Sequence, residues 1–568
     1  MAKHEAHAIP AQPLSSLEGR ILSQGKTLLT RFAAAGRPDH RRYQRARRIY
    51  ALDDDELDAG KRLSPGERTP QLPQLVTSIR NAVADMCDNV PEVLFFPETE
   101  GLEEVARDLT DIMGYTLEQR QFAQTYRQVC EDKFVTGVGV YQIFWDETLE
   151  PGGGIDVIRW PAEALYTDPT TDDYRQGRAI FKVSRHPRSW FAEHYPNQYR
   201  YIGADEPILM EEASFPDDEP MIHLVEYWYR RYDASRGRYT LHSAHLAGGA
   251  LLDASEPTAP QGVYLHGRYP FVLDGYRQVS GRYLGMIDDL YPLQEAANRY
   301  ARYEDRNARL SSRQRFLVNE ASGLNAADVA DCDQEILTAR TINESAVRQL
   351  AAAPLNPQIP AAKLRYLEMI KEESGQNLFN RGETGGGVTA ASAIQALQEA
   401  GNKISRSNLA ATSQAVASLS QQALWLMCQF FQPRRSFYLT GRSGGLTRLL
   451  TEARTVGLSS REITAGFGHP PYLARVQIRK SNPLRIQARN ELILQAAQYA
   501  QKAGTGIRAS VLFQMLNLEG DTDELVRILE EEEKRAASSE AMTPMPQSPE
   551  DIKSPSTDSR QPGPHAPK

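Results

Sequence analysis

The stretch TGGGVTAASAIQALQEAGNKISRSNLAATSQAVASLSQQALWLMCQFF, residues 384–431, decides the fold. It opens with three glycines at 385–387 and contains no proline before Pro433. Apolar or small residues recur along it at gaps of three and four, the period of one helix buried along one stripe. The stripe consists of Ile394, Leu397, Gly401, Ile404, Val416, Leu419, Ala423, Leu426 and Phe430, with Asn408 and Thr412 between its two halves. Such a helix would span roughly 60 Å, and the stretch alone favours a long core helix in a bundle.

Length and composition limit the class of protein. A chain of 568 residues predicts about three or four domains. No run approaches about 18 apolar residues, so we expect no membrane span. The four cysteines lie far apart and form no CxxC pair, which predicts a reducing compartment, no zinc site and no disulfide framework. The net charge of −8 argues against a protein that grips nucleic acid over a broad surface, but permits one that lets it slide past.

Two basic motifs near the N-terminus have a functional and a structural interpretation. The sequence GRILSQGKT at residues 19–27 ends like a phosphate-binding P-loop. However, it has five residues between its glycines where the motif needs four, and no strand precedes it. We therefore predict an amphipathic helix over residues 17–35, with a nucleotide-dependent enzyme as an alternative. The run RRYQRARR at residues 41–48 favours a solvated helix face over a phosphate contact.

Residues 70–282 predict a mixed α+β domain. The helical patterns begin after Pro73 and cover residues 102–129. Two β-rich runs, 137–147 and 155–160, are joined by a Pro/Gly turn and predict a hairpin. Further strands are expected at 93–96, 178–185, 221–231, 237–243 and 268–276. His242 and His245 have no cysteine or HExxH context, so we interpret them as a surface pair and predict no metal site.

The next segments alternate long helices with a small insert. We predict a long helix over 283–312 and a compact α/β insert over 313–360, with strands at 315–320 and 344–350 and a short helix between them. A returning helix covers 361–382, a glycine loop 383–390, and the long helix 391–432. A strand follows Pro433, and amphipathic helices continue to about residue 535.

This order of elements resembles the portal protein of tailed bacteriophages, the head-to-tail connector. The segments SAIQALQEAGNKISRSN (392–408), IDVIRWPAEALYTDPTTDD (155–173) and MIHLVEYWYR (221–230) are similar to its channel helix and wing. The resemblance covers roughly residues 70–440 and implies an α+β, ring-forming portal-type fold. In order, it implies an N-terminal segment (1–69), an α/β wing (70–282), a stem helix (283–312), a clip (313–360), a second stem helix (361–382), a tunnel loop (383–390), a channel helix (391–432), a wing–crown connection (433–485) and a helical crown (486–535). Residues 536–568 are Ser/Pro-rich without aromatics and predict disorder.

The resemblance also implies partners and site residues. We expect a homo-oligomeric, dodecameric ring at the portal vertex of the virion, made in the host cytoplasm, through which double-stranded DNA passes without sequence preference. The expected protein partners are the terminase large subunit, capsid or scaffolding protein, and head-completion or tail adaptor proteins. The tunnel loop and channel helix would present Glu383, Thr384, Gly385, Gly386, Gly387, Lys403 and Arg406 to DNA. The clip would offer Arg313, Arg315, Asp331 and Glu335 to its partners.

Physical reasons connect these residues to a ring and a channel. Glycine adopts dihedrals closed to other residues, so the loop at 385–387 can follow DNA, although a plain flexible turn has the same composition. Lys403 and Arg406 would form sparse positive rings, or else point into a subunit interface. We further expect the long apolar stripes to be covered by neighbouring copies of the chain. No nucleophile–base or paired-carboxylate motif is evident, so we predict neither an enzyme nor a cofactor; a helical scaffold or adaptor without a channel remains an alternative.

Overall fold

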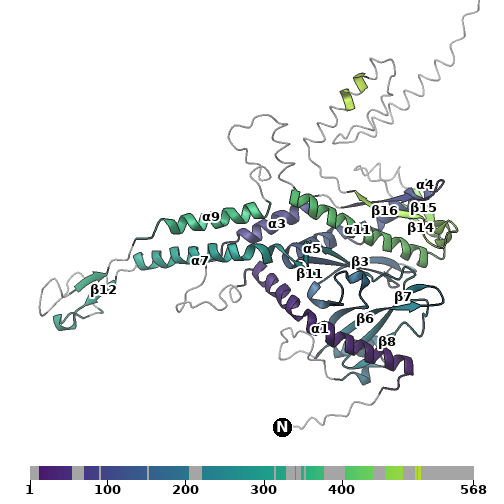
Figure 1. The fold of residues 1–568 in the computed structure, drawn as a ribbon, viewed down its shortest axis with the longest axis horizontal. Helices are drawn as coiled ribbons and strands as arrows, with labels where there is room; N and C mark the ends of the chain where they lie inside the picture. The colour runs from purple at the N-terminus through teal and green to yellow at the C-terminus, as the bar shows by residue number, and fades with distance from the viewer. Residues whose placement is uncertain are drawn as a thin grey trace, which may run out of the picture. The chain divides into compact units, whose positions relative to one another are not determined.

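The computed structural model describes residues 12–53, 70–88, 91–149, 152–203, 220–312, 315–325, 327, 340, 347–350, 354–375, 403–439, 454–477, 493–495 and 497–499. The chain divides into two compact units, Met1–Leu439 with Arg454–Lys480, and Thr440–Ala453 with Ser481–Lys568. Nearly all described residues belong to the first unit, which mixes helices with antiparallel sheets (Figure 1). The α+β class is therefore confirmed. Within the described ranges, no helix has the length and apolar character needed to cross a membrane.

Helix α1 (Ser16–Tyr50) begins at a capping box between Ser15 and Glu18. The predicted helix at 17–35 is confirmed, but it continues through Pro38 to Tyr50. Gly25 lies in the middle of this helix and faces the sheet, where an added Cβ would lie 3.0 Å from Leu246 Cδ1. The glycine therefore permits close helix–sheet packing, and the GKT sequence forms no phosphate-binding loop.

The larger sheet has five antiparallel strands in the order β4-β5-β6-β7-β8. They are β4 (Leu165–Thr167), β5 (Ala179–Pro187), β6 (Met221–Asp233), β7 (Arg238–Ala247) and β8 (Ala250–Ala254). Helix α1 covers one face, where the Phe32 and Phe181 ring centroids lie 5.5 Å apart. The short helix α6 (Arg188–His194) covers the other face, where Phe191 packs with Leu224. Both faces are covered, which explains the near-continuous apolar runs of β5 and β6.

The predicted surface pair of histidines is wrong. His242 is buried in β7, with Nε2 lying 2.9 Å from Thr240 Oγ1. His245 lies on the opposite face of the strand, because the two histidines are three positions apart, and its Nδ1 is 2.8 Å from the Tyr195 hydroxyl. Among the residues that the structure describes, no group of three His, Cys, Asp or Glu side chains is placed to hold a metal ion.

Three helices contribute to the main hydrophobic core, which also includes a smaller, three-stranded sheet. They are α3 (Gln74–Cys87), α4 (Glu103–Gln119) and α5 (Phe122–Thr136). The single helix predicted over 102–129 is wrong, because the chain breaks at Gln121, whose φ of 50° lies in the left-handed region. The apolar pattern runs through this break because α4 and α5 bury their faces in the same core.

The smaller central sheet confirms the predicted hairpin. Strand β2 (Val138–Asp146) pairs with β3 (Gly154–Trp160) on one side and with β9 (Phe271–Gly275) on the other. Four two-stranded sheets complete the strands. They pair β1 (Glu92–Pro97) with β16 (Tyr472–Gln477), β10 (Arg277–Val279) with β11 (Arg282–Leu284), β12 (Arg315–Val318) with β13 (Val347–Leu350), and β14 (Arg435–Leu439) with β15 (Arg454–Leu458). The short helix α13 (Ser460–Thr464) follows β15.

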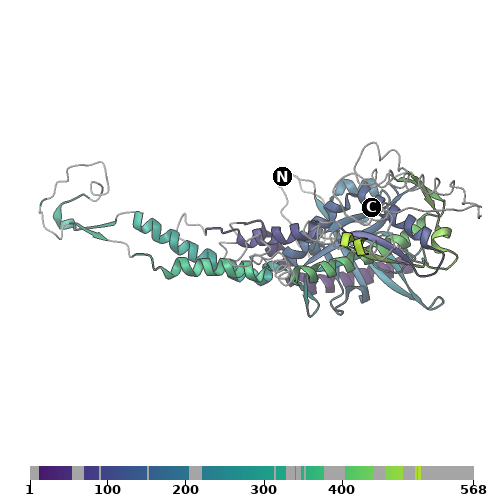
Figure 2. The same ribbon diagram turned by 90° about the horizontal axis from the view of Figure 1, so that it is seen from above.

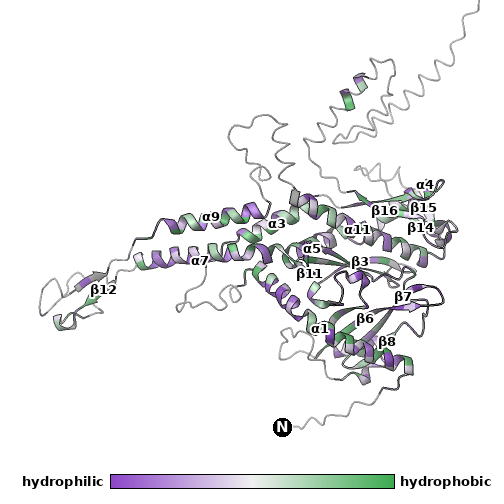
Figure 3. Cartoon of the chain, viewed as in Figure 1, coloured by the Kyte–Doolittle hydropathy of each residue, from purple (hydrophilic) through white to green (hydrophobic). Residues whose placement is uncertain are grey.

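Helices α7 (Met286–Ser312) and α9 (Gln358–Glu373) run side by side, with the hairpin β12–β13 between them in sequence (Figure 2). Helix α7 contains Pro292, and hydrophilic residues occur along much of its length (Figure 3). The described part of the long helix is α11 (Lys403–Phe430), which packs against β2, β9, β16, α3 and α13. The earlier part of the predicted long helix, the short helix between β12 and β13, the crown helices beyond residue 499 and the C-terminal tail lie outside the described residues.

Candidate functional site

Two of the seven predicted DNA-contacting residues, Lys403 and Arg406, lie at the start of α11. Lys403 is its first residue, and Arg406 lies one turn further on, with an exposed side chain that has a partner within the chain. Of the predicted partner-binding residues, Arg315 is placed as the first residue of β12, opposite Leu350 of β13. The remaining predicted site residues lie outside the described residues; they are Glu383, Thr384, Gly385, Gly386, Gly387, Arg313, Asp331 and Glu335.

The described apolar stripe of α11 is buried by the chain itself. Val416 and Leu419 are fully buried, and Ala423 and Leu426 are nearly so, in the core that includes β2, β9 and β16. The expectation that neighbouring copies would cover this stripe is therefore wrong for α11. A helical period shows that a face is buried, but not which chain buries it.

A buried ion pair holds the first half of α11. Lys133 of α5 donates to Asp274 Oδ1 of β9 at 2.7 Å, and both side chains are fully buried. The same ammonium donates to the Asn408 carbonyl oxygen at 3.1 Å and to Thr412 Oγ1 at 2.8 Å, both on α11. The Thr412 hydroxyl in turn donates to Asp274 Oδ2 at 2.6 Å. All three ammonium protons are thus used, so the charges are paired and hydrogen-bonded in a site without water access.

Only half of this network could be found from the sequence. Asn408 and Thr412 stand out because they are polar residues in an apolar stripe. Lys133 and Asp274 lie in separate elements, and nothing in their neighbours marks them as partners. The network requires that α11 take one register against α5 and β9, because a shift along the helix would leave charges buried without partners.

Helix α3 links α7 to α11. Its N-terminus has no side-chain cap of its own, because Pro73 occupies the cap position. Instead, Gln294 Oε1 of α7 accepts from the Leu75 amide at 3.0 Å. Near its other end, Ser405 of α11 donates to Asp85 of α3. A displacement of α7 would therefore disturb the hydrogen bond at the N-terminus of α3. The same helix carries Asp85, which accepts from Ser405 of α11.

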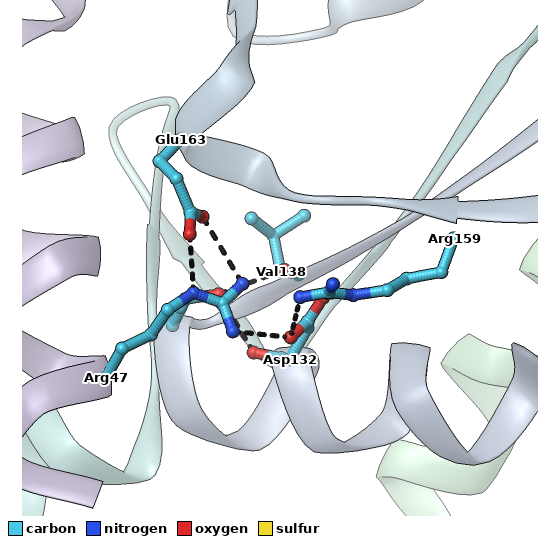
Figure 4. Close-up of polar contacts among 6 residues, drawn as sticks. Arg47, Asp132, Val138, Arg159 and Glu163 are labelled. Carbon is cyan, nitrogen blue, oxygen red and sulfur yellow. Dashed lines mark hydrogen bonds and ion pairs between the residues drawn. The ribbon is translucent and has the colours of Figure 1, made fainter. Parts of the chain in front are cut away.

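A second ion cluster fixes the basic run of α1 (Figure 4). Arg47 donates to Glu163 Oε1 at 2.5 Å and to Asp132 Oδ1 at 2.9 Å, and Arg159 of β3 donates to Asp132 Oδ2 at 2.6 Å. Burial opposes the charge of Arg47, yet Asp132 and Glu163 raise its pKa above the ordinary value. The interpretation of this run as a solvated face is wrong at Arg47, and also at Arg42, whose Nε lies 3.6 Å from Asp288 Oδ1 of α7.

The pair α7–α9 is covered incompletely. Tyr300 and Tyr366 stack between the helices at 5.8 Å, and Lys363 forms an ion pair with Glu304. Yet Leu364 of α9 is 57% exposed, and Tyr303 and Leu310 of α7 are 43% and 40% exposed. Isolated exposed apolar residues are ordinary, so these three become informative only if they lie against a partner. We call Tyr303, Leu310 and Leu364 the helix-pair contact residues.

Comparison with known proteins gives one result. A family model described as Phage P22-like portal protein matches residues 37–560. This range includes α7, α9, α11 and every strand of the fold described above. No curated protein matches the chain.

Proposed function

Because the chain belongs to the family of P22-like phage portal proteins, we propose that copies of it close into a ring at one capsid vertex. Double-stranded DNA passes through this ring during packaging and ejection. The family match over residues 37–560 is the observation that carries the proposal. The portal family is structural rather than catalytic, so the energy for packaging comes from a partner ATPase, the terminase.

The helix-pair contact residues support ring closure. Tyr303, Leu310 and Leu364 are exposed on one chain, and a cyclic ring would bring the same helix pair of the next copy against them. Burying exposed apolar side chains stabilises association by about 25 cal/mol per Å². The stem thus supplies an apolar contact, whereas α11 is already covered within its own chain. The proposed ring is a dodecamer.

The channel is proposed to involve α11 and the glycine loop before it. The network around Lys133 fixes α11 to the body of the subunit. A helix fixed in this way, preceded in sequence by a segment at 383–390 with three glycines, suits DNA translocation, because glycine would let that segment change shape while its support stays in place. Lys403 and Arg406 stand at the beginning of this helix, and they are the proposed sparse positive rings of the bore.

The hairpin β12–β13 is proposed as part of the clip, where terminase and adaptor proteins dock. It lies in sequence between the two stem helices, which suits a segment presented at one end of the stem. Arg313, Arg315, Asp331 and Glu335 are the proposed partner contacts. The nucleotide-enzyme alternative loses its basis, because Gly25, Lys26 and Thr27 lie within α1.

Electron microscopy of the purified protein tests the ring. We expect closed rings with a central hole, together with a sedimentation coefficient of a large oligomer. Monomers or dimers at every concentration would instead support the scaffold or adaptor without a channel.

The tunnel loop has its own test. Deleting residues 384–388 should leave rings intact by microscopy but block DNA packaging or retention in an infection assay. A matched control deletes an equal number of residues within the terminal segment 536–568. Loss of rings in the loop deletion would show that the loop has a structural role.

A further inference from the structure

A cleft of about 620 Å³ lies between α1 and the part of the five-stranded sheet where β5 begins and β6 nears its end. Arg20 of α1, Arg178 just before β5, and Arg230 and Arg231 of β6 line it, with Tyr229 and Glu256 deeper inside. We call this feature the arginine cleft. Its volume falls in the range of ligand sites, about 300–1,000 Å³.

Each guanidinium in the arginine cleft keeps hydrogen-bond donors free. Arg178 uses Nε and Nη2 on Asp168, at 2.8 and 3.4 Å. Arg230 uses Nη1 on the Arg175 carbonyl oxygen at 2.8 Å, while its Nε is buried and, within the described residues, has no partner. A guanidinium carries five N–H donors in a planar fork, so both residues can still bind an anion.

The other two arginines differ in how firmly they are held. Arg231 forms an ion pair with Glu256, which also accepts from the Tyr229 hydroxyl at 2.8 Å. Arg20 is exposed, and in the part of the chain that the structure describes its side chain makes no hydrogen bond or ion pair. Three guanidiniums are therefore oriented in advance, and one is free to close on a ligand.

The arginine cleft has a local positive excess in an acidic protein. Four arginines face two carboxylates, Glu256 and the Asp168 that pairs with Arg178, which leaves an excess of 4 − 2 = +2, whereas the whole chain carries −8. Arginine forks bind phosphate and carboxylate through paired N–H donors.

We propose that the arginine cleft binds phosphate groups, as a DNA-backbone contact outside the channel. This inference rests on the proposed function, because a portal handles double-stranded DNA, which presents a phosphate at about every 1.7 Å of duplex. Contacts to phosphate come mainly from arginine, lysine and polar side chains such as Gln and Tyr, and Gln24 and Tyr229 line the same cleft. Free phosphate or a nucleotide shares this chemistry, and the experiment separates these sources.

The test measures binding of a short, fluorescein-labelled DNA duplex by fluorescence anisotropy over a range of salt concentrations. Replacing Arg20→Ala should weaken binding about threefold to tenfold and reduce the salt slope by about one. Arg20→Glu should weaken it further. The matched control is Arg107→Glu in α4, an exposed arginine far from the cleft in sequence that makes the same change of charge.

Competition identifies the source of the phosphate. Displacement of the duplex by millimolar ATP or inorganic phosphate, lost in Arg20→Ala, indicates a free-phosphate site; no displacement indicates the DNA backbone. Either result supports a phosphate-binding cleft, but displacement by free phosphate would overturn its assignment to the DNA backbone. Equal effects of Arg20→Glu and Arg107→Glu, no effect of Arg20→Ala, or stronger competition by a hexaglutamate peptide than by phosphate would each overturn the proposal.

The same samples are imaged by electron microscopy, which separates this inference from the proposed function. Absence of rings in the wild-type protein would contradict the portal assembly. Wild-type rings that bind DNA independently of Arg20 would contradict only the phosphate role of the arginine cleft.

Discussion

Helix α11 and the helix pair α7–α9 satisfy their side chains in opposite ways. In α11, the apolar stripe is buried within the chain and the polar residues join the network of Lys133 and Asp274. In α7–α9, several apolar side chains stay exposed, and Ile370 is the buried apolar residue of α9. The difference shows that α11 is packed into its own chain, whereas α7 and α9 leave apolar side chains exposed, which the proposed ring would cover with a neighbouring copy.

The largest expected effect is on the buried network. Lys133→Met should lower the free energy of unfolding by about 3–5 kcal/mol, because Asp274 would remain charged and buried without its partner. Urea denaturation followed by circular dichroism, at matched protein concentration, measures this change.

The double variant Lys133→Met/Asp274→Leu is the matched control, and it should recover part of the lost stability because no charge remains buried. A loss below about 1 kcal/mol in the single variant would mean that water or a moving side chain reaches Asp274. The contrast between α11 and the helix pair would then be weaker than the geometry indicates.

A smaller effect is expected where α1 meets the sheet. Burial lowers the pKa of His40 below its ordinary value of 6.5, so the folded chain holds the ring neutral. The unfolded chain binds more protons below about pH 6.5, and stability should therefore fall as the pH drops through this value. Unfolding free energies at pH 7.5 and 5.5 should differ less in His40→Gln than in the wild type. Identical pH dependence in both proteins would exclude His40 as a source of the stability lost at low pH.

The smallest effect on the single chain is expected at Leu364. Leu364→Ser should change the unfolding free energy by less than about 0.5 kcal/mol, because the side chain is already exposed. It should nevertheless reduce the fraction of rings seen by microscopy. On the same helix, Ile370→Ala should cost about 2–5 kcal/mol, because Ile370 is fully buried. If Leu364→Ser destabilised the chain as much as Ile370→Ala, the helix-pair contact residues would be part of the subunit core.

Strong local patterns predicted the elements of the fold. The Pro/Gly turn after β2 indicated the hairpin, and the helical period indicated α7, α9 and α11. The break between α4 and α5 escaped prediction because Gln121 adopts a left-handed backbone without the glycine that usually marks one. The helix at 17–35 and the helix face at 41–48 were expected separately and form one helix through Pro38. The pairing of Arg47 escaped prediction because its acidic partners, such as Asp132, come from distant parts of the chain.

The candidate site was less accessible to sequence reasoning than the fold. A residue such as Lys403 is identified only through the resemblance, which assigns a channel helix to the segment after the glycine loop. Lys133 and Asp274 are identified only by a contact between elements distant in the chain. The period of α11 indicated a buried face, and the covering elements β2, β9 and β16 could be known only from the tertiary structure.

Strand β1 pairs with β16, and in the described part of the chain it has no other strand partner. More than half of the polypeptide is synthesised between the two. While the chain is still on the ribosome, β1 waits with an open hydrogen-bonding edge, which is a template for aggregation. This layer can therefore be completed only late in synthesis, and a product that stops before Tyr472 would leave the edge of β1 unpaired.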